Sequence, residues 1–182
     1  MELWRLRRSI RGWGSIYDAS FDASKLASYI ERCLREGFTF SSISDLGDDD
    51  VSRGKLFELN RKCSADIPGR GAFYTRDEYF VERIDVTTYN PRGVMIAGQS
   101  DQWLGMAAIS DCSEKGYVFG AMTGVRHDFR GRGIAMAMKV LGVSFVRECR
   151  VDVVRTVHHP ENSSMIALNK RLGYVEGQWD YP

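Results

Sequence analysis

The apolar positions of this chain recur with two different periods, which mark out helices and strands. Stripes with steps of three and one residues indicate amphipathic helices, whereas short alternating or β-branched runs indicate strands. The predicted helices span residues 22–36, 51–62, 76–84, 133–149 and 160–172. The predicted strands span residues 38–43, 94–98, 103–110, 117–125 and 151–158. This order predicts an α/β fold.

The first helix belongs to a segment that we separate from the rest of the chain. Residues 1–36 are expected to form an N-terminal extension, with a turn at Gly12, Trp13 and Gly14, and residues 37–182 are expected to form the main domain. The apolar stripe of helix 22–36 includes Leu26, Ile30 and Leu34. Because an exposed stripe would invite association, we expect these three residues to pack on the main domain.

Composition and charge narrow the class of protein. The chain has 182 residues, of which 43% are apolar and 27% charged, so it can bury the core of one domain. Its 25 Lys and Arg nearly balance its 24 Asp and Glu, which argues against a dedicated nucleic-acid binder. Its apolar runs are far shorter than the roughly 20 residues of a membrane helix, and no secretion signal follows the first residues. We expect a soluble cytoplasmic protein that does not bind membranes.

The four cysteines stand far apart in the sequence, and none has a nearby histidine at metal-site spacing. We therefore expect reduced thiols and no bound metal. With no adjacent base to activate them, they also argue against an acyl-cysteine intermediate.

The most informative stretch is VRHDFRGRGIA, residues 125–135, where a predicted strand feeds a glycine-rich turn and then a helix. Backbone amides at a helix N-terminus bind phosphate well where no Cβ blocks the approach, as Gly131 and Gly133 would allow. Arg130 and Arg132 add positive charge. The stretch lacks the Gly-Lys-Ser/Thr ending of a P-loop and the glycine spacing of a dinucleotide-binding turn. A basic surface turn is the plainer interpretation of this stretch taken alone.

This turn resembles the acyl-CoA signature R/Q-x-x-G-x-G/A of the GCN5-related N-acetyltransferase superfamily, with Arg130, Gly133 and Ala135 at the defining positions. A second block, NSSMIALNKRLGY from Asn162, is similar to the superfamily's later signature. The resemblance implies a mixed central sheet splayed between its fourth and fifth strands and flanked by helices. Those strands would be residues 117–125 and 151–158.

The resemblance also implies acetyl-CoA as cosubstrate, with its pantetheine arm on the exposed edge of the fourth strand and its pyrophosphate on the glycine turn. The residues expected to contact acetyl-CoA are Thr123, Val125, Arg130, Gly131, Arg132, Gly133, Ile134, Ala135, Asn162 and Asn169.

The catalytic groups depart from the superfamily's common pattern. Asn169 stands where many relatives carry a tyrosine that protonates the thiolate, and Ala121 and Met122 stand where many carry acidic residues on the fourth strand. An amide cannot act as a general acid. His158 and His159 are the candidate bases because they titrate near neutrality, and ordinary surface positions are the alternative for each.

The sequence gives less support to the substrate contacts than to the acetyl-CoA contacts. Alternation along the fifth strand puts His158 on the same face as Thr156, a candidate substrate contact, and favours His158 as the base. Asp66 could pair with an ammonium group or simply form a turn. Four aromatic side chains near it suggest an apolar wall, although core packing would also explain them: Phe73, Tyr74, Tyr79 and Phe80.

The predicted function is therefore transfer of an acetyl group from acetyl-CoA directly to a primary amine of a small molecule or peptide. One alternative is a module that binds acyl-CoA without catalysis. Another is a nucleic-acid-binding domain that uses Arg126, Arg130 and Arg132, against which the low net charge argues. The sequence leaves the acceptor amine, the acyl chain and the assembly open, a homodimer included.

Overall fold

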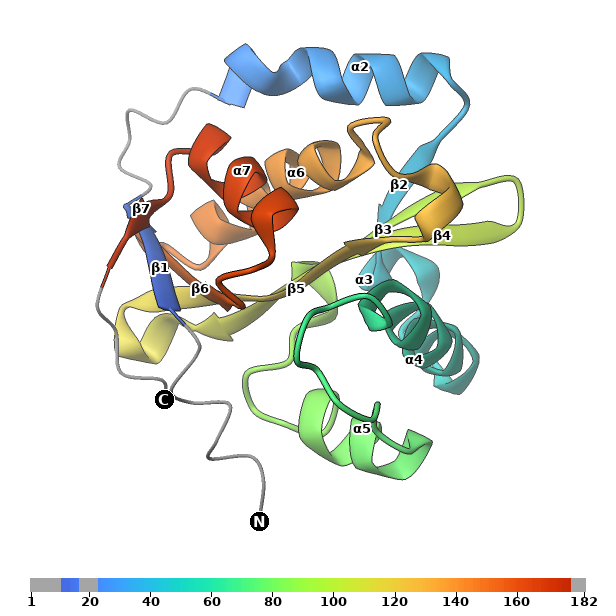
Figure 1. Cartoon of the computed structure of the whole chain (residues 1–182). Helices are drawn as coiled ribbons and strands as arrows, with labels where there is room; N and C mark the ends of the chain where they lie inside the picture. The colour runs from blue at the N-terminus through green and yellow to red at the C-terminus, as the bar shows by residue number, and fades with distance from the viewer. Residues whose placement is uncertain (1–10, 17–22, 178–182) are drawn as a thin grey trace.

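The computed structural model describes residues 11–16 and 23–177, which form one seven-stranded sheet with helices on both faces (Figure 1). The strands lie in the order β2, β3, β4, β5, β6, β1, β7. Their bounds are Arg11–Ile16 (β1), Thr39–Ser42 (β2), Val94–Gln99 (β3), Gln102–Cys112 (β4), Tyr117–Val125 (β5), Val153–His158 (β6) and Val175–Glu176 (β7). Only β5 and β6 pair in parallel, so the predicted mixed α/β sheet is confirmed.

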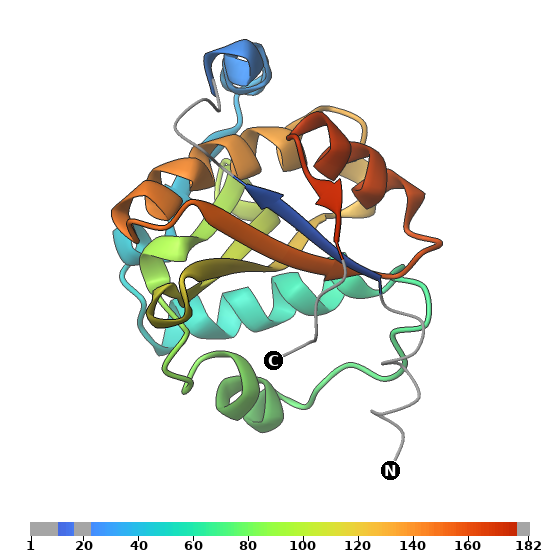
Figure 2. The same ribbon diagram turned by 90° about the vertical axis from the view of Figure 1, so that its left-hand side faces the viewer.

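Helices cover both faces of the sheet. Their bounds are Ala27–Arg35 (α2), Ile43–Leu46 (α3), Asp50–Ser64 (α4), Arg76–Arg83 (α5), Ile134–Glu148 (α6) and Ser163–Arg171 (α7). The helices α6 and α7 lie on one face, and α3, α4 and α5 lie on the other (Figures 1 and 2). The helix α2 packs on the outer side of α6. None of the described helices combines the length and apolar character that a membrane span requires.

Apolar side chains from each helical layer meet the sheet and form its core. On one face Met136, Val140 and Val143 of α6 pack with Val118 of β5 and Val154 of β6. On the opposite face a separate cluster contains Leu56, Leu59 and Cys63 of α4 with Ile96 of β3 and Met106 of β4. Apolar side chains of both helices therefore face the sheet.

The sheet opens between β5 and β6. Their parallel pairing covers Val118–Val154, Phe119–Arg155 and Gly120–Thr156 and then stops, whereas β5 continues to Val125 beside β4. These two strands are the fourth and fifth strands of the resemblance. The splay predicted between them is therefore present, and the end of β5 faces a gap instead of a neighbouring strand.

Three details differ from the sequence predictions. Gly12, Trp13 and Gly14 form no turn, because they lie within β1, which pairs antiparallel with β6 from Arg11–His158 to Ile16–Val153. The short helix α3 was not predicted. It begins where Ser42 and Asp45 form a capping box, in which the Ser42 side chain accepts from the Asp45 amide and Asp45 accepts from the Ser42 amide.

The third difference concerns the stripe of α2. Leu26 and Ile30 pack against the apolar cluster around α6, as predicted, but Leu34 is 54% exposed. The neighbouring Cys33 is fully buried instead. The division of the chain at residue 37 stays a prediction.

Candidate active site

A β-bulge marks the point where β5 leaves β6. The register between β4 and β5 shifts after Ala108, which opposes Met122, because the next residue, Ile109, opposes Gly120. Ala121 is thus the extra residue on β5, directly after the last β5–β6 pair. Bulges bend a strand and change the direction of its side chains, and they are frequent next to active sites.

The glycine turn lies at the far end of β5, where the chain enters α6. Gly131 and Gly133 have φ angles of 77° and 84°, in the left-handed region that glycine adopts without strain. Gly133 is the N-cap of α6 and leaves the first amides of that helix without a side-chain cap. An added Cβ at Gly131 would meet nothing within 4 Å. The turn is therefore open to an anion at Gly131, and α6 supplies the positive end of its dipole.

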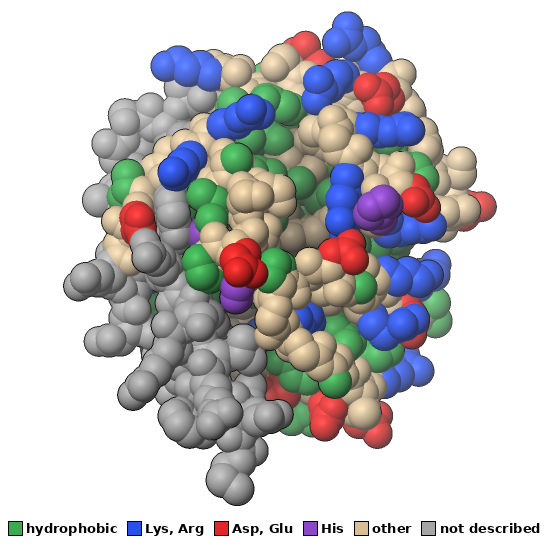
Figure 3. Space-filling model, in the orientation of Figure 1, with side chains coloured by type: hydrophobic (Ala, Val, Ile, Leu, Met, Phe, Trp, Pro, Cys, Tyr) green, Lys and Arg blue, Asp and Glu red, His purple; other side chains and the backbone are tan. Residues whose placement is uncertain are grey.

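A cavity of about 540 Å³ joins this turn to the open end of β5, and we call it the turn cavity. It is bounded by β5, α7, α2 and the loop after α4, and the face drawn in Figure 3 is hollowed beneath α2, with Lys and Arg side chains around the hollow. The predicted acetyl-CoA contacts that line it are Thr123, Val125, Arg130, Gly131, Gly133, Ile134, Ala135 and Asn162. Eight of the ten predicted contacts are therefore brought together.

The other two predicted contacts, Arg132 and Asn169, do not line the turn cavity. They also do not line a second, smaller cavity on the opposite face of the sheet. Arg132 lies over the rings of Phe38 and Phe129, at 5.9 and 5.7 Å from their centroids. Asn169 is fully buried and its Oδ1 accepts a hydrogen bond from Nζ of Lys139 at 2.7 Å. Both side chains thus make contacts within the fold, and their role as acetyl-CoA contacts stays a prediction.

The helix α2 brings two further residues to the turn cavity that the sequence did not reveal. The Nη2 of Arg32 donates to the carbonyl of Arg132 at 3.0 Å, and its guanidinium lies 5.4 Å from the ring centroid of Tyr29. A Cβ added at Gly133 would meet both side chains, so they lie directly on the turn. Arg171 of α7 donates to the Tyr29 hydroxyl at 3.4 Å. Three arginines, Arg32, Arg130 and Arg171, thus line one cavity.

The two predicted substrate contacts, Asp66 and Thr156, both form contacts within the protein. Asp66 lies in the turn cavity, where its carboxylate pairs with Nη1 of Arg130 at 2.8 Å. Thr156 donates through Oγ1 to the Gly120 carbonyl at 2.8 Å and so completes the last β5–β6 pair. Thr156 lines neither cavity, and Asp66 is engaged by an arginine instead of an amine.

The two candidate bases, His158 and His159, come two and three residues after Thr156, the last β6 residue that pairs with β5. Thr156 and His158 do share the buried face of β6, as strand alternation predicted. His158 is only 7% exposed, and burial lowers the pKa of its imidazole. The Nδ1 atom of His159 accepts a hydrogen bond from the backbone amide of Glu161 at 3.3 Å. Neither histidine lines either cavity.

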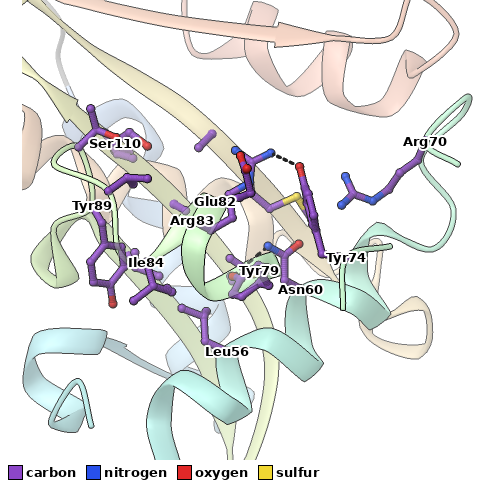
Figure 4. A pocket seen from close by; sticks show the side chains of 18 residues that line it. Leu56, Asn60, Arg70, Tyr74, Tyr79, Glu82, Arg83, Ile84, Tyr89 and Ser110 are labelled. Carbon is purple, nitrogen blue, oxygen red and sulfur yellow. Dashed lines mark hydrogen bonds between the residues drawn. The ribbon is translucent and has the colours of Figure 1, made fainter. Parts of the chain in front are cut away.

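A second cavity of about 100 Å³ lies on the opposite face of the sheet, and we call it the aromatic cavity. Its wall contains Tyr74, Tyr79 and Tyr89, as well as Ala121 and Met122 at the bulge of β5. Tyr79 is 2% exposed, and its hydroxyl accepts a hydrogen bond from Nδ2 of Asn60 at 3.2 Å (Figure 4). Of the four aromatic residues predicted to form an apolar wall, Tyr74 and Tyr79 line this cavity, and Phe73 and Phe80 pack beside Tyr79.

Charged side chains at the aromatic cavity were also missed by the sequence. Arg70, Glu82 and Arg83 line it together with Ser110. Arg70 belongs to the loop after α4, and the other two charged residues belong to α5. No local pattern marks them, because they meet only when the loop and the helix fold over β4 and β5.

The four cysteines are free thiols in the described structure. Burial raises the pKa of Cys63, which lines the turn cavity, to about 11, and burial likewise raises that of Cys149 to about 11. The pKa values of Cys33 and Cys112 are also raised by burial. A thiol with a raised pKa is mostly protonated near neutrality and is a poor nucleophile.

No protein-family model matches this chain, and no curated protein matches its sequence. Solved structures do match its fold. A GCN5-related N-acetyltransferase from Sphaerobacter thermophilus matches with a TM-score of 0.65 and 18% identity, over 92% of this chain and 48% of that one. The ribosomal-protein-S18-alanine N-acetyltransferase from Escherichia coli matches with a TM-score of 0.59 and 13% identity, over 78% and 79%.

An aminoglycoside N-acetyltransferase in complex with CoA matches with a TM-score of 0.59 and 16% identity, over 79% of this chain and 91% of that one. This chain therefore has the fold of the GCN5-related N-acetyltransferases. It spans about half the length of the Sphaerobacter structure.

Proposed function

We propose that this protein transfers an acetyl group from acetyl-CoA to a primary amine of a small molecule or peptide. The observation that carries this proposal is the end of β5. Its pairing with β6 stops at Gly120, and the remaining edge lies along a cavity that reaches the glycine turn. The proposal is supported by the N-acetyltransferases that share this fold, one of which is a complex with CoA.

The residues of the turn cavity fit acetyl-CoA. The backbone of β5 beyond Gly120 has no β6 partner among the described residues, so it can hydrogen-bond the two amides of a pantetheine arm as an added strand would. The open turn at Gly131 and the free amides of α6 suit a pyrophosphate. Arg32, Arg130 and Arg171 supply charge for phosphate groups.

In the proposed reaction the amine nitrogen attacks the thioester carbonyl carbon, a C–N bond forms, and the C–S bond breaks. The amine loses one proton and the released thiolate takes up one, so the products are an N-acetylated amine and CoA with a free thiol. The chain's part is positioning: the aromatic cavity holds the amine beside Ala121 and Met122, and the end of β5 holds the thioester from the other side. No enzyme nucleophile is needed, in keeping with four buried or half-buried thiols of raised pKa.

An ammonium substrate must lose its proton before it attacks. Glu82 is the carboxylate among the residues that line the aromatic cavity, which makes it the base we favour, acting directly or through a water molecule. The role of His158 or His159 as base stays a prediction.

A second candidate function is acyl-CoA binding without catalysis. Asn169 favours this function. It stands where many members of the superfamily that the chain resembles carry a tyrosine that protonates the thiolate, and here it accepts a hydrogen bond from Lys139 inside the fold.

Two measurements separate the two candidates. Calorimetry with acetyl-CoA tests the turn cavity, and a panel of amines scored by free-thiol release, with release in the absence of amine subtracted, tests transfer. We expect both to be positive. Binding without release would leave the non-catalytic module, and absence of binding would refute both functions.

A further inference from the structure

Two arginines reach the aromatic cavity from different elements. Arg83, in the last turn of α5, donates from Nη2 to the Tyr74 hydroxyl at 3.1 Å. Arg70, in the loop before α5, places its guanidinium 4.7 Å from the ring centroid of Phe73 and 5.7 Å from that of Tyr74. Figure 4 shows the Arg70 guanidinium pointing toward Tyr74. Both guanidinium groups are therefore held beside the same phenol ring.

Neither guanidinium forms an ion pair with a carboxylate of the described chain. Other arginines show the contrast: Arg53 pairs with Asp48 at 3.0 Å, and Arg92 pairs with Glu148 at 2.9 Å. Glu82 lines the same cavity without pairing with either arginine. The Nε of Arg70 is buried and has no hydrogen-bond partner among the described residues.

This arrangement disfavours the charged form of Arg70. Burial lowers the pKa of its guanidinium, and the like charge of Arg83 lowers it further. Two like charges that share a cavity wall are stabilised when an anion lies between them, and a guanidinium can bind a carboxylate through two parallel hydrogen bonds. Stacking on Phe73 and Tyr74 fixes the plane of Arg70 and leaves its N–H edge available for such a bond.

We propose that the acceptor is a small amine that also carries a carboxylate, and that Arg70 and Arg83 bind this carboxylate while the amine lies at the bulge of β5. The proposal rests on the proposed acetyl transfer and specifies its substrate class. The cavity reaches from the two arginines to Ala121 and Met122, so one occupant can contact both ends. A volume of about 100 Å³ suits a small amino acid and not a folded protein surface. The product is the N-acetylated amino acid, with CoA released as the thiol.

The test compares amines that differ only in the anionic group. The series runs from glycine through β-alanine and γ-aminobutyrate to ε-aminocaproate, each beside its carboxamide and the alkylamine of equal length. We expect kcat/KM for the preferred amino acid to exceed that for its carboxamide by about tenfold to a hundredfold, as a charge-assisted hydrogen bond provides. Equal kcat/KM values for acid and carboxamide throughout the series would overturn the proposal.

Variants identify the residues responsible. Arg70→Gln and Arg83→Gln should each remove most of the preference for the carboxylate, measured as the ratio of kcat/KM for the acid to that for its carboxamide, while acetyl-CoA affinity stays within about twofold because neither residue lines the turn cavity. Arg76→Gln is the matched control, because Arg76 is on the same helix, lies 5.4 Å from the Phe80 ring centroid and does not line the cavity. Loss of the preference in Arg76→Gln, or its retention in both other variants, would contradict the assignment.

The outcomes separate this proposal from the proposed function. If carboxamides and alkylamines are acetylated as well as the amino acids, acetyl transfer stands and the carboxylate site falls. If acetyl-CoA binds but no amine is turned over, calorimetry with the four amino acids decides: binding that Arg70→Gln weakens supports the carboxylate site, and no binding refutes it. If acetyl-CoA does not bind, both proposals fail together.

Discussion

Gly131 and Gly133 have similar backbone conformations but different surroundings. A side chain at Gly133 would collide with Arg32 and Tyr29 of α2, whereas a side chain at Gly131 would enter open space. A substitution at Gly133 therefore confounds anion binding with the packing of α2. Gly131 is the position at which charge alone can be varied.

We predict that Gly131→Asp weakens acetyl-CoA binding by about tenfold or more relative to Gly131→Asn. Both side chains have the same shape and tolerate a positive φ better than other residues, so only the negative charge beside the proposed pyrophosphate distinguishes them. Calorimetry on the two folded variants measures the difference. Equal affinities would mean that the pyrophosphate does not bind at this turn.

A second prediction concerns the proton acceptor. Glu82→Gln should lower turnover by about a hundredfold, because it removes the carboxylate at the aromatic cavity. His158→Ala should leave turnover nearly unchanged, since His158 is a buried residue of β6 that lines neither cavity. The reverse pattern would assign the base to His158.

Lys139 gives a prediction about stability. Burial lowers the pKa of its ammonium group from 10.5 to about 8, so between these values the unfolded chain binds a proton that the folded chain has released. The contribution of Lys139 to the free energy of unfolding should therefore rise with pH over this interval, by about 1–3 kcal/mol. Denaturant unfolding of the parent and of Lys139→Met across this range measures it. A constant difference between the two proteins would contradict the lowered pKa.

At the scale of elements, α2 is a helix of the outer layer that reaches the candidate site. One side packs on α6 through Ile30, and the same helix carries Arg32 and Tyr29 to the turn cavity. Its packing thus fixes two side chains at the proposed phosphate site.

We predict that Ile30→Ala lowers the free energy of unfolding by about 1–2 kcal/mol, since a half-buried aliphatic side chain is lost from an apolar cluster. Leu34→Ala is the matched change on the same helix and should stay within about 0.5 kcal/mol, because Leu34 is 54% exposed. Chemical denaturation compares them. Similar losses in both variants would mean that α2 does not pack through Ile30.

The sequence predicted elements well where a local pattern governs them. The strand 117–125 matches β5 at both ends, and the glycine turn was located because its chemistry depends on adjacent backbone amides. Alternation placed Thr156 and His158 on one face but could not say which layer that face meets. Arg32, Arg70 and Arg83 were missed because each reaches its cavity through tertiary packing, which leaves no periodic signal in the sequence.

The same limit explains the error at Gly12, Trp13 and Gly14. Glycines flanking a tryptophan favour a turn locally, but the edge of β6 offers hydrogen bonds to a distant segment, and pairing with it outweighs local preference.

At the scale of the whole molecule, the two cavities lie on either side of β5 and approach the same short stretch of it. One contains Thr123, Gly124 and Val125, and the other contains Ala121 and Met122. This arrangement suits two substrates bound at once.

We therefore predict direct transfer within a ternary complex. Incubation with acetyl-CoA alone should leave the protein mass unchanged, because burial raises the pKa of the thiol nearest the site, Cys63. Initial rates at varied concentrations of both substrates should give intersecting reciprocal plots. An acetyl adduct on Cys63 that an amine discharges would establish a covalent route instead.

The position of β1 between β6 and β7 has a consequence for how the chain acquires its structure. Its backbone partners lie near the opposite end of the described sequence, so closing this pair carries the entropy of a very long loop and raises the contact order. During synthesis β1 leaves the ribosome long before β6 exists. The half of the sheet beyond the splay must therefore be assembled last, after translation has passed β6, while β2 to β5 can pair as they emerge.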